Sequence, residues 1–326
     1  MATAFSPANS VTTTTAATFI PEIWSDEIVA AYKKNLVLAN LVQKMNFRGK
    51  KGDTVHVPSP TRGSASAKAA TNAVTLIAAT ESEVQILINK HYEYSRLIED
   101  IVETQALNSL RQFYTSDAGY ALARQVDTDL IRLGRAFNGA TVGTDDYATS
   151  ASSTAAYIGS NGTTAYNSST SNAAALTDAA IRRTIQRLDD NDTPMDGRFF
   201  IIPPSSRNTL MGLARYTEQA FIGEAGNNNT IRNGEIGNLY GIPVFVTSNA
   251  DFGAGNSGAD RICLMGHKES MVLVEQLAVR SQTQYKQEYL GTLFTADTLY
   301  GVKAMRTAAT SGAATSSSAF ALAVPA

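Results

Sequence analysis

The longest helical pattern in the chain is the feature that most limits its fold. Between Ile98 and Ala136, apolar side chains recur at helical spacing with no proline among them. The stripe consists of Val102, Ala106, Leu110, Phe113, Leu122, Val126, Leu130 and Leu133. At 1.5 Å per residue, about 39 residues would span roughly 58 Å, several times the usual helix length. We therefore expect a partner surface along this helix, or a bend near Gly119.

Two alternating segments before this helix predict a projecting β-hairpin. The first is Thr54–Pro58, which follows a turn at Gly49 and Gly52. The second places the apolar residues Val84, Ile86, Ile88, Tyr92 and Tyr94 on one side of a strand. The segment between them is rich in Ala, Ser and Thr and carries Arg62 and Lys68. An isolated two-stranded ribbon is barely stable in water, so we expect the hairpin to lean on a neighbouring subunit.

The N-terminal region and the middle of the chain have few charges. Residues 1–21 contain no charged side chain and no apolar block, which predicts a flexible arm with no secretory signal. An amphipathic segment follows from Trp24 to about Leu41. No basic residue occurs between Arg135 and Arg182, and this polar stretch predicts a surface insertion with a short strand near Tyr157.

The C-terminal half alternates between helical and strand patterns. The expected elements are a helix at Ile181–Leu188, a buried strand at Arg198–Ile202, a helix from an N-cap at Ser205 to Arg215, a strand at Val244–Thr247, a hairpin of Arg261–Leu264 with Met271–Glu275, a strand at Thr298–Met305 and an uncharged tail from Thr307. The strand at Val244 follows a glycine-punctuated turn, and it stops at Ser248–Asn249.

Composition excludes several functional classes. The formal net charge of -2 gives no strong attraction to nucleic acid or to an anionic membrane. No run approaches the roughly 18 apolar residues of a membrane-spanning helix, so we expect no membrane partner. The single cysteine, Cys263, lies in an apolar strand-like run and is interpreted as a small buried hydrophobe, which fits a reducing cytosol.

The candidate ligand motifs lack the context that their chemistry requires. Gly253–Gly258 has the spacing of a dinucleotide-binding loop, but a strand pattern follows it where a helix is needed to hold the pyrophosphate. Asp190–Asp192 resembles the start of a calcium loop, but Pro194 occupies the position of the third oxygen ligand.

Catalytic and metal sites also find no support in the sequence. The histidines His56, His91 and His267 show no metal-ligand spacing, and no nucleophile elbow surrounds a serine. A basic helix face of Arg182, Arg183 and Arg187 is interpreted as solvated or subunit-facing because aspartates adjoin it. We predict no enzymatic activity, no cofactor and no metal.

The order of these parts resembles the major capsid protein of tailed bacteriophages, the Hong Kong 97 phage-type (HK97-like) α+β fold. The likeness covers nearly the whole chain. The segments that carry it are Phe19–Ser25, Arg198–Pro204, Asn233–Asn249 and Tyr300–Lys303. The resemblance, which is closest to podophage-like members, implies an N-terminal arm with the amphipathic segment (1–48), an extended loop (49–90), a peripheral domain (91–175) with a spine helix at 98–136, an axial domain (176–280), and return strands with a tail (281–326).

The resemblance further implies a structural protein that assembles into pentamers and hexamers of an icosahedral shell around double-stranded DNA. Its expected partners are other copies of itself, a scaffolding protein, a portal, and DNA held without sequence specificity. It would assemble in the bacterial host cytoplasm and reside in the virion. Inter-subunit contacts are expected in the segments that contain Trp24, Arg62, Lys68 and Glu93. Lys68 is the loop-tip lysine, but no crosslinking partner is identifiable, so we predict no covalent crosslinks.

Two alternatives remain open from the sequence. A bacterial nanocompartment (encapsulin-type) shell protein would share the fold and enclose enzymes. A Ser/Thr-rich extracellular surface-layer protein or adhesin would need a secretion signal, and residues 1–21 show none. A nucleotide-binding enzyme is favoured less than either.

Overall fold

The computed structural model of the chain describes residues 37–60, 65–68, 70, 73–74, 76, 81–101, 110–134, 156–167, 170–213, 237–250, 252–254, 260–305 and 317–326. Within these residues the helices are α1 (Leu38–Leu41), α3 (Leu110–Leu133), α4 (Asp178–Asp190), α5 (Pro204–Met211), η4 (Lys268–Ser270) and η5 (Gln287–Tyr289). The strands are β1 (Gln43–Asn46), β2 (Thr54–Pro60), β3 (Glu81–Leu87), β4 (Lys90–Glu99), β5 (Tyr157–Ile158), β6 (Arg198–Ile202), β7 (Asn238–Leu239), β8 (Ile242–Val246), β9 (Phe252–Ala254), β10 (Asp260–His267), β11 (Met271–Lys286), β12 (Gly291–Ala304) and β13 (Ala319–Pro325).

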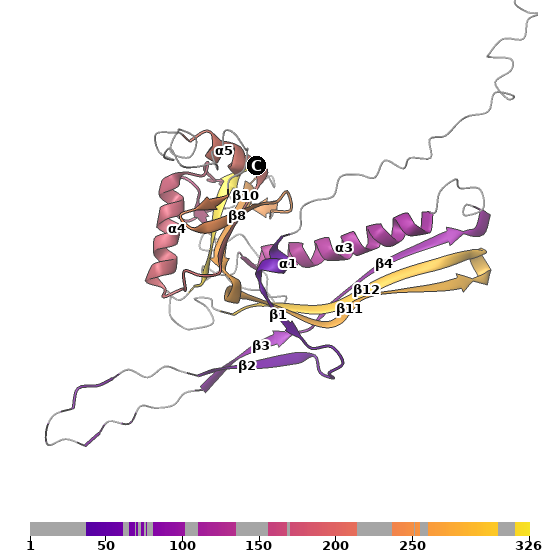
Figure 1. Cartoon of the computed structure of the whole chain (residues 1–326), viewed down its shortest axis with the longest axis horizontal. Coiled ribbons are helices and arrows are strands. Elements are labelled where there is room, and N and C mark those ends of the chain that lie inside the picture. Colours follow the sequence, from indigo (N-terminus) through magenta and orange to yellow (C-terminus); the bar gives the residue numbers. More distant parts are fainter. Residues whose placement is uncertain are drawn as a thin grey trace, which may run out of the picture.

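The described strands form a large sheet, a long sheet and a separate hairpin (Figure 1). The large sheet has the order β5-β13-β10-β6-β8-β7, with β9 also paired to β10. The long sheet has the order β1-β11-β12-β4, and the hairpin consists of β2 and β3. In Figure 1 the large sheet lies beside α4 and α5, while α3 runs along the long sheet.

Strand β6 separates two hydrophobic cores. Every residue of β6 is buried. Phe199 and Ile201 face a core shared with α3, whereas Phe200 and Ile202 face a core that includes residues of α4 and α5. A strand that is covered on both faces needs apolar side chains at consecutive positions. This explains why the strand predicted at Arg198–Ile202 is confirmed at both ends.

The glycine-punctuated strand entry predicted from the sequence is confirmed. Tyr240 (φ 52°) and Gly241 (φ 82°) form the two-residue turn between the antiparallel strands β7 and β8. Two consecutive positive φ angles are typical of a type I′ turn, whose twist matches that of a hairpin. β8 then runs parallel to β6 and ends at Val246, close to the predicted end at Thr247.

The long helix has the partner surface that its sequence requires. Ala118 and Leu122 of α3 pack against Phe294 and Ala296 of β12, next to tyrosines of β4. α3 runs without interruption through Gly119, where an added Cβ would have no neighbour within 4 Å. The long sheet therefore supports the helix along its length, and the helix needs no bend.

The predicted start of this helix at Ile98 is wrong. Ile98 and Glu99 are the last residues of β4, where they pair with Thr292 and Gly291 of β12. Asp100 and Ile101 are helical, residues 102–109 lie outside the described residues, and α3 ends at Leu133. Cross-strand pairing overrides the helical spacing at this boundary because the apolar alternation of β4 continues to Ile98.

The predicted hairpin of Arg261–Leu264 with Met271–Glu275 is also wrong. β10 and β11 follow each other through the short helix η4, but they belong to different sheets. β10 is already paired on both sides, with β6 and with β13. The approach of β13 is so close that a Cβ on Gly266 would lie 2.7 Å from Cβ of Ala319.

Two further expectations need correction. The tail from Thr307 contains β13, a strand that is buried from Ala319 to Val324 in the interior of the large sheet. The second helix of the C-terminal half ends at Met211, and its N-cap is Pro203, with no capping bond from Ser205. The short strand expected near Tyr157 is confirmed as β5, but it pairs with β13 within the large sheet rather than on a surface insertion.

Candidate assembly surfaces

The β2–β3 hairpin is held at its base and projects away from the rest of the chain (Figure 1). Ile86 and Ile88 are buried against Val272 and Val274 of β11. Ile88 N–H also donates to the Asp53 carbonyl at 2.8 Å. The predicted strand Thr54–Pro58 is therefore confirmed, whereas the second alternating run divides into β3 and β4 after Leu87. This arrangement anchors the hairpin firmly at one end.

A bulge in β11 adds a polar anchor at the same place. The register of β11 with β12 shifts between Glu275 and Leu277, so Gln276 is left over from the ladder. Its Nε2 donates to the carbonyls of Lys50 and Gly52 at 3.0 and 2.9 Å. The bulge thus directs a side chain to the turn that leads into the hairpin.

The described residues of the hairpin tip are exposed. Val74 and Leu76 are 72% and 90% exposed, and Lys68 is exposed as well. Arg62 and Trp24, which the sequence suggested as contact residues, lie outside the described residues. Large apolar side chains that one subunit leaves exposed on a projection are typical of a surface that another molecule covers.

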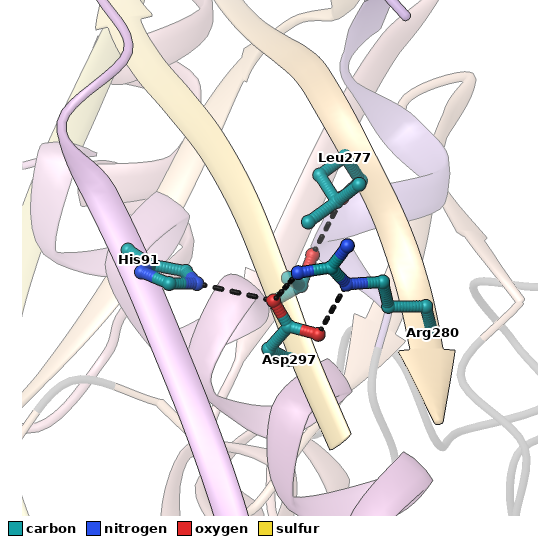
Figure 2. Close-up of polar contacts among 5 residues, drawn as sticks. His91, Leu277, Arg280 and Asp297 are labelled. Atoms are coloured by element: carbon teal, nitrogen blue, oxygen red, sulfur yellow. Dashed lines mark hydrogen bonds and ion pairs between the residues drawn. The ribbon is translucent and has the colours of Figure 1, made fainter. Parts of the chain in front are cut away.

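A second register shift in β11 creates an ionic cluster in the long sheet (Figure 2). Arg280 donates from Nε and Nη2 to the two carboxylate oxygens of Asp297 at 2.7 and 2.9 Å. His91 Nε2 lies 3.2 Å from Asp297 Oδ2, and Thr298 Oγ1 donates to the Leu277 carbonyl at 3.0 Å. The hydrogen bonds from Arg280 hold the pKa of Asp297 below its ordinary value despite an opposing effect of burial.

This cluster explains the position of Glu93, the fourth suggested contact residue. Glu93 is exposed on β4 and lies directly opposite Asp297 of β12. Like charges in directly opposed positions destabilise a sheet. Arg280 on the other side of Asp297 offsets this repulsion. Glu93 is therefore placed on the face of the long sheet opposite to the face that packs on α3.

The three arginines of α4 do not form one open basic face. Arg182 pairs with Asp178 at 2.8 Å, and Arg183 donates to Gln186 at 2.8 Å. The Arg187 guanidinium stacks on the ring of Tyr157, with its central carbon 3.5 Å from the ring centre. Burial lowers the pKa of Arg187. Each arginine thus has a partner within the subunit, and Arg182 and Arg183 remain exposed to solvent.

The described residues contain no cluster that could hold a metal ion. No group of three or more His, Cys, Asp or Glu side chains among them gathers as a metal ion would require. His56, His91 and His267 contact separate partners, Glu83, Asp297 and the Asp196 carbonyl. Residues 255–259 lie outside the described part, and the chain that follows them is the strand β10 rather than a helix, so a dinucleotide site has no helix N-terminus there.

Cys263 is buried in the core on the α4 side of the large sheet. Its Sγ lies 3.4 Å from Oγ of Ser206, and burial raises its pKa to about 12. A thiol with this environment is inert at neutral pH, which confirms the interpretation as a buried hydrophobe. Among the helices that the structure describes, none is sufficiently long and apolar to cross a bilayer.

The large sheet, the long sheet and α3 share one core. Leu130 and Leu133 of α3, Phe199 of β6 and Val302 of β12 all belong to it, and Leu38 of α1 packs into it. Asp129 is buried beside this core, where it accepts hydrogen bonds from Tyr300 Oη at 2.7 Å and from Gln125 at 2.8 Å. We call this region the joint, because it is where these parts of the chain meet.

A core that joins two sheets, a projecting hairpin and a long sheet backed by a helix are the parts of the HK97-like α+β capsid fold. A family model described as "Phage capsid protein" matches residues 19–310. The chain therefore belongs to the phage capsid protein family, and it is a structural component of the capsid shell of a phage virion. The family resemblance and the fold class expected from the sequence are confirmed.

Solved structures share the fold at low sequence identity. A structure from Mycobacterium phage Che8 has a TM-score of 0.70 and 21% identity, with 93% of this chain and 97% of the other covered. The capsid of cyanophage P-SCSP1u has a TM-score of 0.69 and 17% identity, with 95% and 94% covered. The capsid of Ralstonia phage GP4 has a TM-score of 0.65 and 15% identity, with 94% and 95% covered. No curated protein sequence matches the chain significantly.

Proposed function

We propose that copies of this chain assemble into pentamers and hexamers that close into an icosahedral head around double-stranded DNA. The observation that carries the proposal is the β2–β3 hairpin, which is anchored at its base and exposes Val74 and Leu76 beyond it. A contact from this projection to a different patch on the next copy is heterologous, and such contacts form rings when the rotation closes.

The proposal assigns a role to each segment. Residues 1–48 form an arm that includes Trp24, residues 49–90 extend over the adjacent copy with Arg62 and Lys68, and residues 91–175 belong to a peripheral part that includes Glu93. Residues 176–270 form the axial part, and 271–304 return to the peripheral part, because β11 and β12 share the long sheet with β4. The pairing of β13 with β10 supports counting residues 319–325 with the axial part.

The tip of the long sheet supports a second contact between copies. Tyr289 and Leu290 are 63% and 67% exposed at the connection between β11 and β12. Leu290 adopts a left-handed backbone conformation (φ 43°), which is unfavourable for a bulky residue. Strained backbone that presents an exposed apolar side chain is typical of a contact or binding site.

The wider partners follow from the same proposal. The packaged DNA contacts the shell non-specifically and only weakly, and the weakness follows from a net charge of -2, which gives no strong attraction to phosphates. A scaffolding protein and a portal complete the assembly, which takes place in the bacterial cytoplasm. No enzymatic activity, cofactor or covalent crosslink is assigned.

Electron microscopy of the purified chain, alone and with a scaffolding protein, tests the proposal. We expect closed particles with five-fold vertices and six-fold faces, and a single monomer band for intact particles on a denaturing gel. Unassembled subunits under both conditions would contradict the shell geometry. A ladder of bands would contradict the absence of crosslinks while leaving the shell geometry intact.

A further inference from the structure

One buried carboxylate at the joint connects three separate parts of the chain. Asp127 lies in α3 and has no exposed surface. Its Oδ1 accepts hydrogen bonds from the backbone N–H groups of Leu38 at 2.8 Å and Ala39 at 3.3 Å. Its Oδ2 accepts a hydrogen bond from Nδ2 of Asn249 at 3.0 Å. One oxygen thus holds α1, and the other holds the segment that follows β8 in the large sheet.

The partners of this carboxylate are neutral groups. Backbone amides and the Asn249 side chain supply the hydrogen bonds, and burial raises the pKa of Asp127 above its ordinary value. A buried carboxylate without a cation costs free energy that its hydrogen bonds offset only in part. A carboxylate at this position therefore contributes little net stability to the core. Its role is geometric, because it fixes the positions of the groups that donate to it. It is acceptor-only, so each oxygen accepts donors arriving from a different direction.

Asn249 is itself held in a defined position. Its backbone N–H donates to Thr247 Oγ1 at 3.1 Å, and its Nδ2 also lies 3.2 Å from Oγ1 of Thr128 in α3. Asn249 is nearly fully buried. A displacement of the large sheet relative to α3 would therefore break these bonds before it separated the apolar surfaces.

We propose that Asp127 is a positioning residue that fixes the angle between α3, the arm entering at α1 and the large sheet, and thereby sets the curvature of the shell. The inference rests on the proposed assembly into a closed shell. Asp127 lies 17 residues from the far end of α3 at Leu110, a distance of about 26 Å, so a rotation of ~5° at Asp127 moves that end by ~2 Å. Displacements of that size exceed what a packed interface between copies tolerates without rearranging.

Two variants provide the test: the single variant Asn249→Asp and the double variant that exchanges the residues at positions 127 and 249. The single variant places two carboxylates against each other, so Oδ2 of Asp127 loses its donor and faces a like charge when both groups are ionised. In the double variant Asp127→Asn with Asn249→Asp, the amide oxygen of residue 127 accepts from α1 and its NH2 group donates to the carboxylate at 249. The complementarity is restored with the donor and acceptor exchanged. Asp129→Asn is the matched control, because Asp129 is equally buried but bonds to Gln125 and Tyr300 rather than to α1 or Asn249.

Two measurements are made on each variant. Hydrogen exchange on the unassembled subunit follows the Leu38 and Ala39 amides, and electron microscopy follows the distribution of particle diameters. We expect Asn249→Asp to speed exchange of these amides about tenfold, although the hydrogen bonds of Asn249 go to Thr247 and to α3, and to broaden the diameter distribution. The swap restores both values. Asp129→Asn changes neither, even where it lowers the melting temperature.

The outcomes separate this inference from the proposed function. Unchanged exchange and a wild-type diameter distribution in Asn249→Asp would overturn the inference while the shell assembly stands. If the unmodified chain forms no closed particles, the proposed function fails, and the exchange measurement still decides whether Asp127 couples α1 to the large sheet. If Asn249→Asp does not fold, Asn249→Ala removes the same donor without adding charge, and the same two measurements then decide.

Discussion

The large sheet and the β2–β3 hairpin differ in whether their apolar side chains are buried or exposed. Strand β6 is buried at every residue and has a core on each face. The hairpin buries Ile86 and Ile88 at its base but exposes Val74 and Leu76 toward its tip. Changes in the large sheet should therefore act on folding, whereas changes at the hairpin tip should act on assembly and leave the fold intact.

Removing β13 should have the largest effect on the folded side of this comparison. Deletion of residues 319–326 leaves β10 without the neighbour that pairs with Asp260 to Gly266 on one side, and it opens three hydrophobic cores. We expect the subunit to lose its cooperative unfolding transition, measured by circular dichroism with heating. Deleting Ala326 alone is the control, because this residue is exposed. A cooperative transition in the longer deletion would mean that the large sheet does not depend on β13.

Replacing the hairpin tip should remove assembly without unfolding the subunit. We expect a variant in which a short Asn-Gly turn replaces residues 61–80 to keep its melting temperature within about 2 °C, since it removes no residue of the described cores. The same variant should form no closed particles by electron microscopy. Lys68→Ser is the matched control for charge at the tip. Normal particles from the shortened variant would show that the tip is not an assembly surface.

The sequence predicts the parts of this fold whose signals are local. Phe199–Ile202 are apolar at consecutive positions because both faces of β6 are covered, and Tyr240–Gly241 fits the turn between β7 and β8. β13 escapes prediction because its short Ala-rich sequence has a weak strand preference, and pairing with β10 decides its conformation. The start of the long helix fails for the same reason, since pairing with β12 extends β4 to Glu99.

The joint shows a second limit of the sequence. Asp127 and Asp129 lie within the long helical pattern, where charged residues are ordinarily exposed, so the sequence does not indicate that both are buried. The partners of Asp127 cannot be read from the sequence, because Asn249 lies 122 positions from Asp127 and Leu38 lies 89 positions away. The predicted strand stops at Ser248–Asn249, and the hydrogen bond that Asn249 donates to Asp127 depends entirely on tertiary structure.

A methyl group on Gly301 should push the base of the hairpin away from the long sheet. A Cβ at Gly301 of β12 would lie 2.4 Å from the Leu87 carbonyl oxygen, where β3 ends. We expect Gly301→Ala to lower the free energy of unfolding by about 1–3 kcal/mol, because backbone on both sides must shift. Denaturant unfolding measures the loss, and hydrogen exchange at Ile88 N–H reports the base of the hairpin. Gly119→Ala is the control, since open space surrounds that position and alanine favours a helix. Equal stability of the two variants would contradict the close approach.

The ionic cluster of the long sheet should give the smallest effect, and it should depend on pH. Because hydrogen bonds from Arg280 lower the pKa of Asp297, the ionised form stabilises the folded state. This contribution is complete above the ordinary pKa of an aspartate and is lost as the pH falls through the lower pKa of the folded state. Asp297→Asn should therefore lower the melting temperature by less than ~3 °C at neutral pH, in the range of exposed ion pairs, and the difference should vanish in acid. Arg280→Gln is the matched variant, because it removes the cation and leaves the carboxylate facing Glu93. If the melting temperature of Asp297→Asn differs from that of the wild type by the same amount at every pH in this range, Asp297 is not held by Arg280. The exposed face of the long sheet would then resemble the hairpin tip rather than the joint.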